Sequence, residues 1–122
     1  MRLLLAVLLL TLGLVTASPA QDAAAFYRGK QIRLIVGTAA GQDYDIWARL
    51  IARHLGRHIP GTPGFVVENM PGGGHIIATN YLFNIAAKDG SVLGMVTRNI
   101  TDDAILNFPN VRFEPQKFVG DR

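Results

Sequence analysis

The hydrophobic positions of this sequence form short aliphatic runs that alternate with helical repeats. The run at 31–36 (QIRLIV) ends at a glycine and is typical of a buried parallel strand. From 45 to 58, apolar residues return at spacings of three and four, which predicts a helix. Asp43 or Asp45 can accept hydrogen bonds from the free amides at its start. The core side of this helix is expected to consist of Ile46, Trp47, Leu50, Ile51 and Leu55.

The same alternation continues through the second half of the chain. After the turn residues of 60–64, the run at 65–69 (FVVEN) predicts a second strand. Helical spacing then predicts a helix over about 74–87, and 91–97 (SVLGMVT) predicts a third strand. Residues 102–108 are expected to form a short helix. Strand, helix, strand, helix, strand on short connections predicts an α/β layer with a parallel sheet and right-handed crossovers.

A different pattern occupies the first twenty residues. Arg2 is followed by an apolar stretch from Leu3 to Val15 that contains no charged residue. About thirteen residues is shorter than the roughly 20 that a membrane-spanning helix needs, and small residues follow at Ser18 and Ala20. Residues 1–20 are therefore predicted to be a cleavable signal peptide for export from the cytoplasm. An uncleaved anchor or a buried helix is the alternative.

Charge and composition narrow the classes of function. Without Arg2, eleven Lys and Arg residues stand against nine Asp and Glu, a net charge of +2 that favours anions mildly. Arg49, Arg53 and Arg57 are spaced to form one stripe on the predicted helix, which is typical of a solvated face and not of a nucleic-acid site. The sequence contains no cysteine, which excludes disulfides and thiolate metal sites. Residues 21–122 suffice for one compact domain and exclude a second.

Two glycine-bearing loops, 37–45 and 70–75, follow predicted strands and precede predicted helices. Ligands of parallel sheets bind at the carboxyl ends of the strands, and a helix start offers free amides and a positive dipole end to an anion. The loops therefore predict a site for a small carboxylate, although tight turns without a ligand are the alternative. The residues expected to contribute backbone approach or side-chain hydrogen bonds are Thr38, Gln42, Gly72, Gly73, Gly74 and His75.

Sequence motifs for catalysis, metals and nucleotides are incomplete. A dinucleotide fingerprint starting at Gly72 requires Gly or Ala where Ile77 stands, and no P-loop Lys-Ser/Thr pair follows. His54 and His58 lie four residues apart, but a catalytic zinc needs three protein ligands and no HExxH glutamate lies between them. Ser91 has no neighbouring base in the sequence. We expect no catalytic residue, metal or cofactor, and a phosphate- or nucleotide-binding βαβ enzyme fragment is the alternative function.

The stretch from 26 to 97 resembles the opening of the tripartite tricarboxylate transporter substrate-binding proteins, the Bug receptors. The resemblance rests on QIRLIVG, on the loop that ends in Tyr44-Asp45, on VVENMPGGG and on AAKDGSVLG. It implies a two-lobed extracytoplasmic receptor that closes over a di- or tricarboxylate or a related small acid. It also implies delivery of this acid to membrane permease subunits, without catalysis. By position, the resemblance adds Ala39, Gly41 and Asp45 to the candidate ligand-binding residues.

In that family the chain continues beyond the point that corresponds to Arg122 and builds a second lobe. Residues 21–122 are therefore expected to form a partial, parallel-sheet first lobe of a type II-like periplasmic binding protein, with the second lobe absent. A truncated product, a frameshifted remnant, a functional short form, and an inert or sensory remnant all fit this expectation. A ligand held by one lobe stays half exposed, so we expect weak or no binding by this chain alone.

Overall fold

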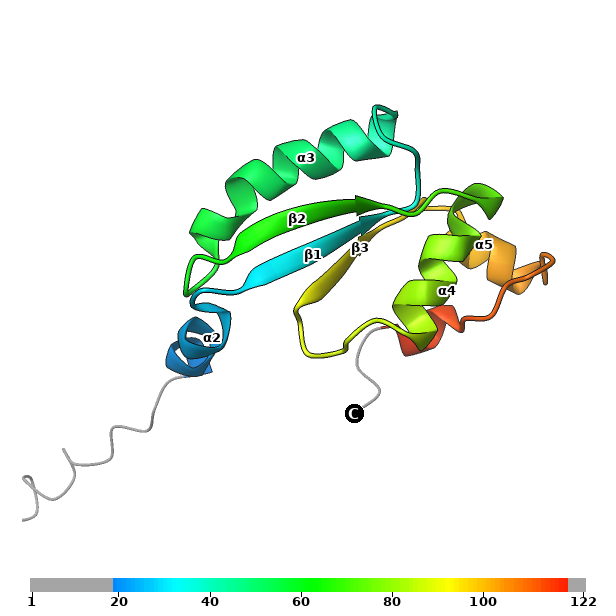
Figure 1. The fold of residues 1–122 in the computed structure, drawn as a ribbon. Coiled ribbons are helices and arrows are strands. Elements are labelled where there is room, and N and C mark those ends of the chain that lie inside the picture. Colours follow the sequence, from blue (N-terminus) through cyan, green and yellow to red (C-terminus); the bar gives the residue numbers. More distant parts are fainter. Residues whose placement is uncertain (1–18, 119–122) are drawn as a thin grey trace, which may run out of the picture.

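The computed structural model describes residues 19–118, and the predicted signal peptide up to Ser18 lies outside the described residues. Three parallel strands form the sheet in the order β2-β1-β3, with helices on both faces (Figure 1). The strands are β1 (Gln31–Val36), β2 (Gly64–Asn69) and β3 (Val92–Met95). The predicted α/β class with a parallel sheet is confirmed. The predicted bounds of β1 are also confirmed, whereas β2 begins one residue earlier than predicted and β3 is shorter at both ends.

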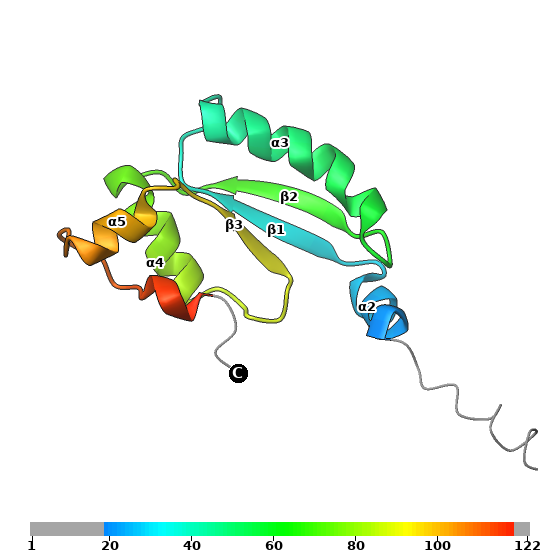
Figure 2. The same ribbon diagram turned by 180° about the vertical axis from the view of Figure 1, so that it is seen from behind.

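The two crossover helices lie on opposite faces of the sheet (Figures 1 and 2). α3 (Asp43–Leu55) packs through Ala48 on Leu34 and Val36 of β1. α4 (Ile76–Asn84) lies on the other face, where its Tyr81 hydroxyl accepts a hydrogen bond from Arg33 Nη1 at 2.9 Å. Since successive strand residues point to opposite faces, Arg33 and Leu34 distinguish the two sides. The first crossover leads from β1 to β2, and the second leads from β2 back past β1 to β3, in the opposite direction across the sheet. Because both crossovers are right-handed, their helices lie on opposite faces.

The helical segments differ from the predictions mainly at their ends. The helix predicted over 45–58 is α3 followed by a short 3-10 helix, η2 (Gly56–His58). The helix predicted over 74–87 is a 3-10 turn, η3 (Gly73–His75), followed by α4. α4 ends early because the Ile85 and Ala86 amides both turn back to the Tyr81 carbonyl, each at 2.9 Å. The remaining helical elements are α2 (Pro19–Tyr27) and η4 (Pro115–Lys117), neither of which was predicted, and α5 (Ile100–Ile105) near the predicted 102–108.

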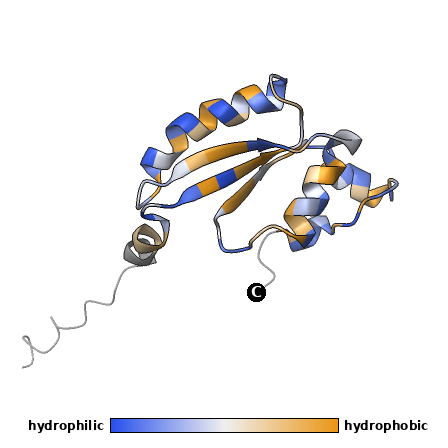
Figure 3. Ribbon diagram, viewed as in Figure 1, coloured by the Kyte–Doolittle hydropathy of each residue, from blue (hydrophilic) through white to orange (hydrophobic). Residues whose placement is uncertain are grey.

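The predicted core side of α3 is wrong. Trp47 is 59% exposed and Ile46 is 60% exposed, and the buried residues of the helix are Asp45 and Ala48. The sheet side of α3 carries Tyr44, Ala48 and Ala52 at spacings of four, and the two alanines allow the helix to lie close to β1 and β2. Hydrophobic residues therefore occur on two sides of this helix. In Figure 3, hydrophobic and hydrophilic segments alternate along α3.

The segment after α5 is attached to α4 by two asparagine side chains. Asn80 donates from Nδ2 to the Asn110 carbonyl and accepts at Oδ1 from the Arg112 amide, each at 2.8 Å. Asn84 Nδ2 donates to the Arg112 carbonyl at 2.8 Å. These bonds hold the C-terminal part of the described chain on the α4 side of the sheet. Among the described helices, none is both long and apolar enough to cross a bilayer.

Candidate functional site

The two glycine-bearing loops lie side by side at the carboxyl edge of the sheet. Val36 and Asn69, the last residues of β1 and β2, are paired in register, and the Met70 amide donates to the Val36 carbonyl at 2.7 Å. The Gly37 amide donates to the Met95 carbonyl of β3 at 3.1 Å. The loop from Gly37 to Gln42 and the loop from Met70 to His75 therefore leave the sheet at neighbouring points. This is the arrangement that the order of the predicted elements requires.

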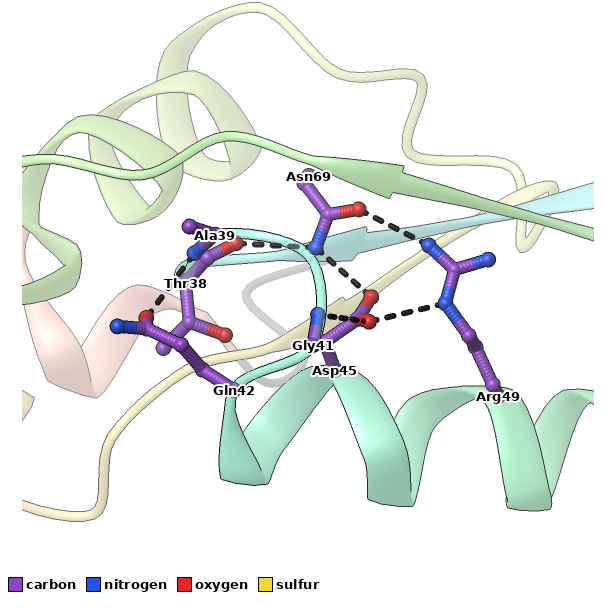
Figure 4. Close-up of polar contacts among 7 residues, drawn as sticks. All are labelled: Thr38, Ala39, Gly41, Gln42, Asp45, Arg49 and Asn69. Atoms are coloured by element: carbon purple, nitrogen blue, oxygen red, sulfur yellow. Dashed lines mark hydrogen bonds and ion pairs between the residues drawn. The ribbon is translucent and has the colours of Figure 1, made fainter.

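A buried carboxylate holds the first loop in place (Figure 4). Asp45 is 2% exposed and accepts three hydrogen bonds. Its Oδ2 accepts from the Gly41 amide at 2.8 Å and from Arg49 Nε at 2.9 Å, and its Oδ1 accepts from Asn69 Nδ2 at 2.8 Å. The Arg49 guanidinium, followed by the Gly41 amide and the Asn69 side chain, holds the pKa of Asp45 well below its usual range. Asp45 is therefore ionised and fully engaged within the protein.

Asn69 completes this network from the end of β2. Its Nδ2 also donates to the Thr38 carbonyl at 3.0 Å, and its Oδ1 accepts from Arg49 Nη2 at 3.1 Å. Neither Asn69 nor Arg49 was predicted from the sequence to be a site residue. The available signal was a polar residue at a strand end directly before the glycine turn, and an arginine four residues after an acid on a helix. Arg49, predicted to lie on a solvated stripe, is half exposed and has a defined positioning role.

The predicted ligand-binding residues of the first loop bond largely to one another. The Ala39 amide donates to Gln42 Oε1 at 3.1 Å, and the Gln42 amide donates to the Ala39 carbonyl at 3.3 Å. The Gly41 amide is directed at Asp45, as described above. Of this set, only the Thr38 hydroxyl is buried with no hydrogen-bond partner in the part of the chain that the structure describes. We assign Asp45 a positioning role, with Ala39 and Gln42 forming an exchangeable contact on the surface.

The second loop has an uncommon backbone conformation. Four successive residues have positive φ angles: 131° at Gly72, 57° at Gly73, 60° at Gly74 and 77° at His75. L-residues with a side chain rarely adopt this region, so the glycine triplet is required by the turn itself, whether or not a ligand binds. His75 is the exception, because it carries a side chain and still adopts the left-handed conformation. It precedes α4 with no side-chain cap, as Gln42 does for α3, so both helices begin at this edge without a capping side chain.

His75 joins the two loops through its ring. The ring makes an edge-to-face contact with Tyr44, with centroids 4.9 Å apart, and lies directly against Gly37. Its Nδ1 is buried and has no hydrogen-bond partner among residues 19–118. Burial lowers the pKa of His75 below 6.5, although the charge of Asp43 acts in the opposite direction. The neutral form of His75 is therefore the one that fits the folded chain.

Acidification from pH 7 to pH 5 should destabilise the chain through His75. Because the pKa of His75 is lower in the folded chain, the unfolded chain binds the proton more readily. The contribution of neutral His75 to the free energy of unfolding is therefore complete above pH 6.5 and falls as the pH drops below this value. The pKa values of Asp45, Glu68 and Asp89 are lowered from about 4, so these groups act only in a more acidic range. Urea midpoints at pH 5 and 7 should differ less in His75→Gln than in the wild type or in the exposed control His58→Gln. An equal difference in all three proteins would contradict this assignment.

The two loops form an open site. One cavity, of about 820 Å³, lies between α5 and the segment 111–116, and another, of about 710 Å³, runs along α4 and β3. Neither cavity is lined by a residue of the two loops. Within residues 19–118, no three His, Asp or Glu side chains are grouped so that they could hold a metal ion.

Two helix starts lie at this edge, and Asp45 and Asn69 hold the first loop in position. Thr38 Oγ1 and His75 Nδ1 are buried there without a hydrogen-bond partner among residues 19–118. No protein-family model matches this chain, and no curated protein matches it.

Proposed function

We propose that this chain binds a carboxylate group of a small organic acid at the carboxyl edge of its sheet, between the loops 37–42 and 70–75. The observation that carries the proposal is the convergence at one edge of the start of α3, which has no side-chain cap, and the glycine turn before α4. The first amides of α4 itself, those of Ile76 and Ile77, already donate to the Gly73 and Gly72 carbonyls. A helix start favours an anion through its free amides and its dipole. Thr38 Oγ1 is buried at the same edge and has no hydrogen-bond partner among residues 19–118, so it would supply a further donor once the first loop moves to expose it.

Binding would exchange contacts in the first loop. Gln42 Oε1, on an exposed side chain, now accepts the Ala39 amide hydrogen, and a ligand oxygen would replace it. The second ligand oxygen would accept from amides of the second loop at Gly73, Gly74 or His75. The Asp45 network keeps the first loop in position during this exchange. The binding step therefore replaces one neutral acceptor with a charged one, which forms the stronger hydrogen bond.

The wider role follows from the sequence resemblance. In this proposal the chain is the periplasmic solute-binding component of a tripartite tricarboxylate-type uptake system, exported by its signal peptide. Its sheet is the first lobe of a type II-like binding protein, its solute is a di- or tricarboxylate or a related acid, and its partners are membrane permease subunits. The three-stranded parallel sheet with crossovers on both faces supports this role.

Titration followed by two-dimensional NMR of the secreted, ¹⁵N-labelled chain tests the binding proposal. Citrate, succinate and glutarate at millimolar concentrations should shift the amide signals of Thr38 to Gln42 and of Gly72 to His75, because a single open site binds weakly. The matched controls are the corresponding methyl esters, which lack the charge. Shifts that are absent from both loops, or equal with the esters, would contradict the proposal. A larger response to a nucleotide than to every acid would favour a phosphate-binding function.

Asp43→Asn should leave carboxylate binding unchanged or make it tighter. Asp43 is an exposed acid in the first turn of α3, and its charge reaches the loops, since it acts on the pKa of His75. Removing a negative charge near the ligand removes repulsion. The dissociation constant from the same NMR titration checks this, with Asp102→Asn in α5 as the control for an exposed acid elsewhere. A large loss of affinity would show that Asp43 makes a favourable ligand contact.

A further inference from the structure

The outer side of α3 is an apolar surface that no described element covers. Ile46, Trp47, Leu50 and Ile51 are 60%, 59%, 44% and 39% exposed. In both ribbon views α3 is the outermost layer on its side of the sheet (Figures 1 and 2). Apolar side chains gathered on one exposed face of a helix mark an interaction surface more often than single scattered ones do.

Charged residues extend this apolar surface at both ends, with opposite signs. Asp43 is exposed at the start of α3, and Arg53 and Arg57 are exposed at its end and in η2. Steps of three and four residues lead from Asp43 through Trp47 and Leu50 to Arg57, so these positions lie along one side of the helix. Within residues 19–118, neither Asp43 nor Arg57 forms an ion pair. We call this surface the α3 stripe: Asp43, Ile46, Trp47, Leu50, Ile51, Arg53 and Arg57.

We propose that the α3 stripe binds a second copy of this chain, with the two α3 helices antiparallel and centred on Leu50. In this register Asp43 faces the partner's Arg57, and Trp47 faces the partner's Arg53. The first pair is an ion pair that occurs twice across the two-fold axis, and the second places a guanidinium beside an indole ring. The two helix dipoles are also antiparallel, which places their positive and negative ends side by side and is favourable.

The order of charges along the α3 stripe favours a second copy of this chain as the partner. A stripe that is acidic at one end and basic at the other is complementary to itself only when reversed. In a parallel pair, Asp43 would face a second Asp43 and Arg57 a second Arg57, which is unfavourable. A partner helix of uniform charge would match one end and be repelled at the other. A reversed copy of α3 matches the apolar centre and both charged ends.

The dimer should be weak. A standard interface buries about 800 Å² on each partner, and a single short helix pair buries less. Association should therefore be observed at micromolar to millimolar concentrations of the secreted chain. Trp47 is the only tryptophan in the sequence, so its fluorescence reports on this surface alone. Its emission should shift to shorter wavelength as sedimentation velocity shows the dimer forming. A monomer throughout this range, or a dimer with unchanged Trp47 emission, would overturn the proposal.

Charge reversal provides the sharper experiment. Asp43→Arg and Arg57→Asp should each weaken the dimer by about tenfold or more, because each places like charges opposite each other twice. An equimolar mixture of the two variants should dimerise again, since every charged contact then joins opposite signs, and the double variant should do the same. The control Arg112→Asp lies on the α4 side of the sheet and should have no effect. Circular dichroism confirms the folding of each variant. Dimerisation that is unchanged in both single variants, or an equimolar mixture that stays monomeric, would overturn the proposal.

Discussion

Gly37→Ala should disrupt the candidate site strongly, although Gly37 needs no positive φ angle. A Cβ atom at Gly37 would lie 2.2 Å from His75 Nδ1, 2.7 Å from its Cγ and 2.9 Å from its Cβ. Rotation of the ring does not relieve this overlap, because the His75 Cβ is itself too close. The two loops must therefore separate, at a cost of about 1–3 kcal/mol in the free energy of unfolding. We also expect the loss of carboxylate-induced NMR shifts in both loops.

Urea denaturation and the NMR titration measure both effects. Gly64→Ala is the matched control, because its added Cβ would meet nothing closer than 3.5 Å. The double variant Gly37→Ala/His75→Gly should recover most of the lost stability, since it removes the ring and gives a glycine to a position with φ at 77°. Wild-type stability and binding in Gly37→Ala alone would show that the ring and the loop adjust freely.

Asp45→Asn should destabilise the chain almost as much as Asp45→Ala. All three partners of the carboxylate, the Gly41 amide, Arg49 and Asn69, are donors. An asparagine amide at this position would direct its own donor at one of them and would leave Arg49 without a counter-charge. We expect the thermal midpoint to fall by about 5–10 °C in either variant, as is usual when a buried network is broken in a domain of this size.

The pH dependence separates this effect from a general loss of packing. A carboxylate with a lowered folded-state pKa stabilises the fold fully above its unfolded value of 3.8, and this contribution is lost as the pH falls through the folded-state pKa. The gap between wild type and Asp45→Asn in thermal midpoint should therefore be full at pH 6 and narrow below pH 3.8. Asp102→Asn, at an exposed acid of α5, serves as the control. A gap independent of pH would contradict the role given to the charge.

The sequence predicts the sheet well and the packing of α3 poorly, and the reason is physical. β1 is an aliphatic run between polar residues, and such a run has few alternatives to a buried strand. α3 has apolar residues on two sides, and periodicity alone cannot show which side meets the sheet. Ala48 and Ala52 face it because small side chains let the helix approach. Trp47 was predicted to be buried from its place in the apolar repeat, and this spacing does not register the steric preference for alanine.

The residues that hold the candidate site show a second limit. The two loops could be placed at one edge from the order of the elements, and the structure places them there. Asn69 could not be joined to Thr38 and Asp45 in this way, because the pairing of Val36 with Asn69 depends on the strand register. Similarly, no local rule places a histidine in a left-handed conformation after three glycines. The contact of His75 with Gly37 exists only in three dimensions.

The asparagine pair on α4 has a consequence for how the chain tolerates change. The hydrogen bonds of Asn80 and Asn84 to the segment after α5 all go to backbone atoms, those of Asn110 and Arg112. The attachment is therefore indifferent to the side chain at position 112 and excludes only proline there, which lacks the amide hydrogen. Unrelated residues could be grafted at this position while the segment keeps its place, whereas a change at Asn80 would remove two of its three hydrogen bonds to α4 whatever its sequence.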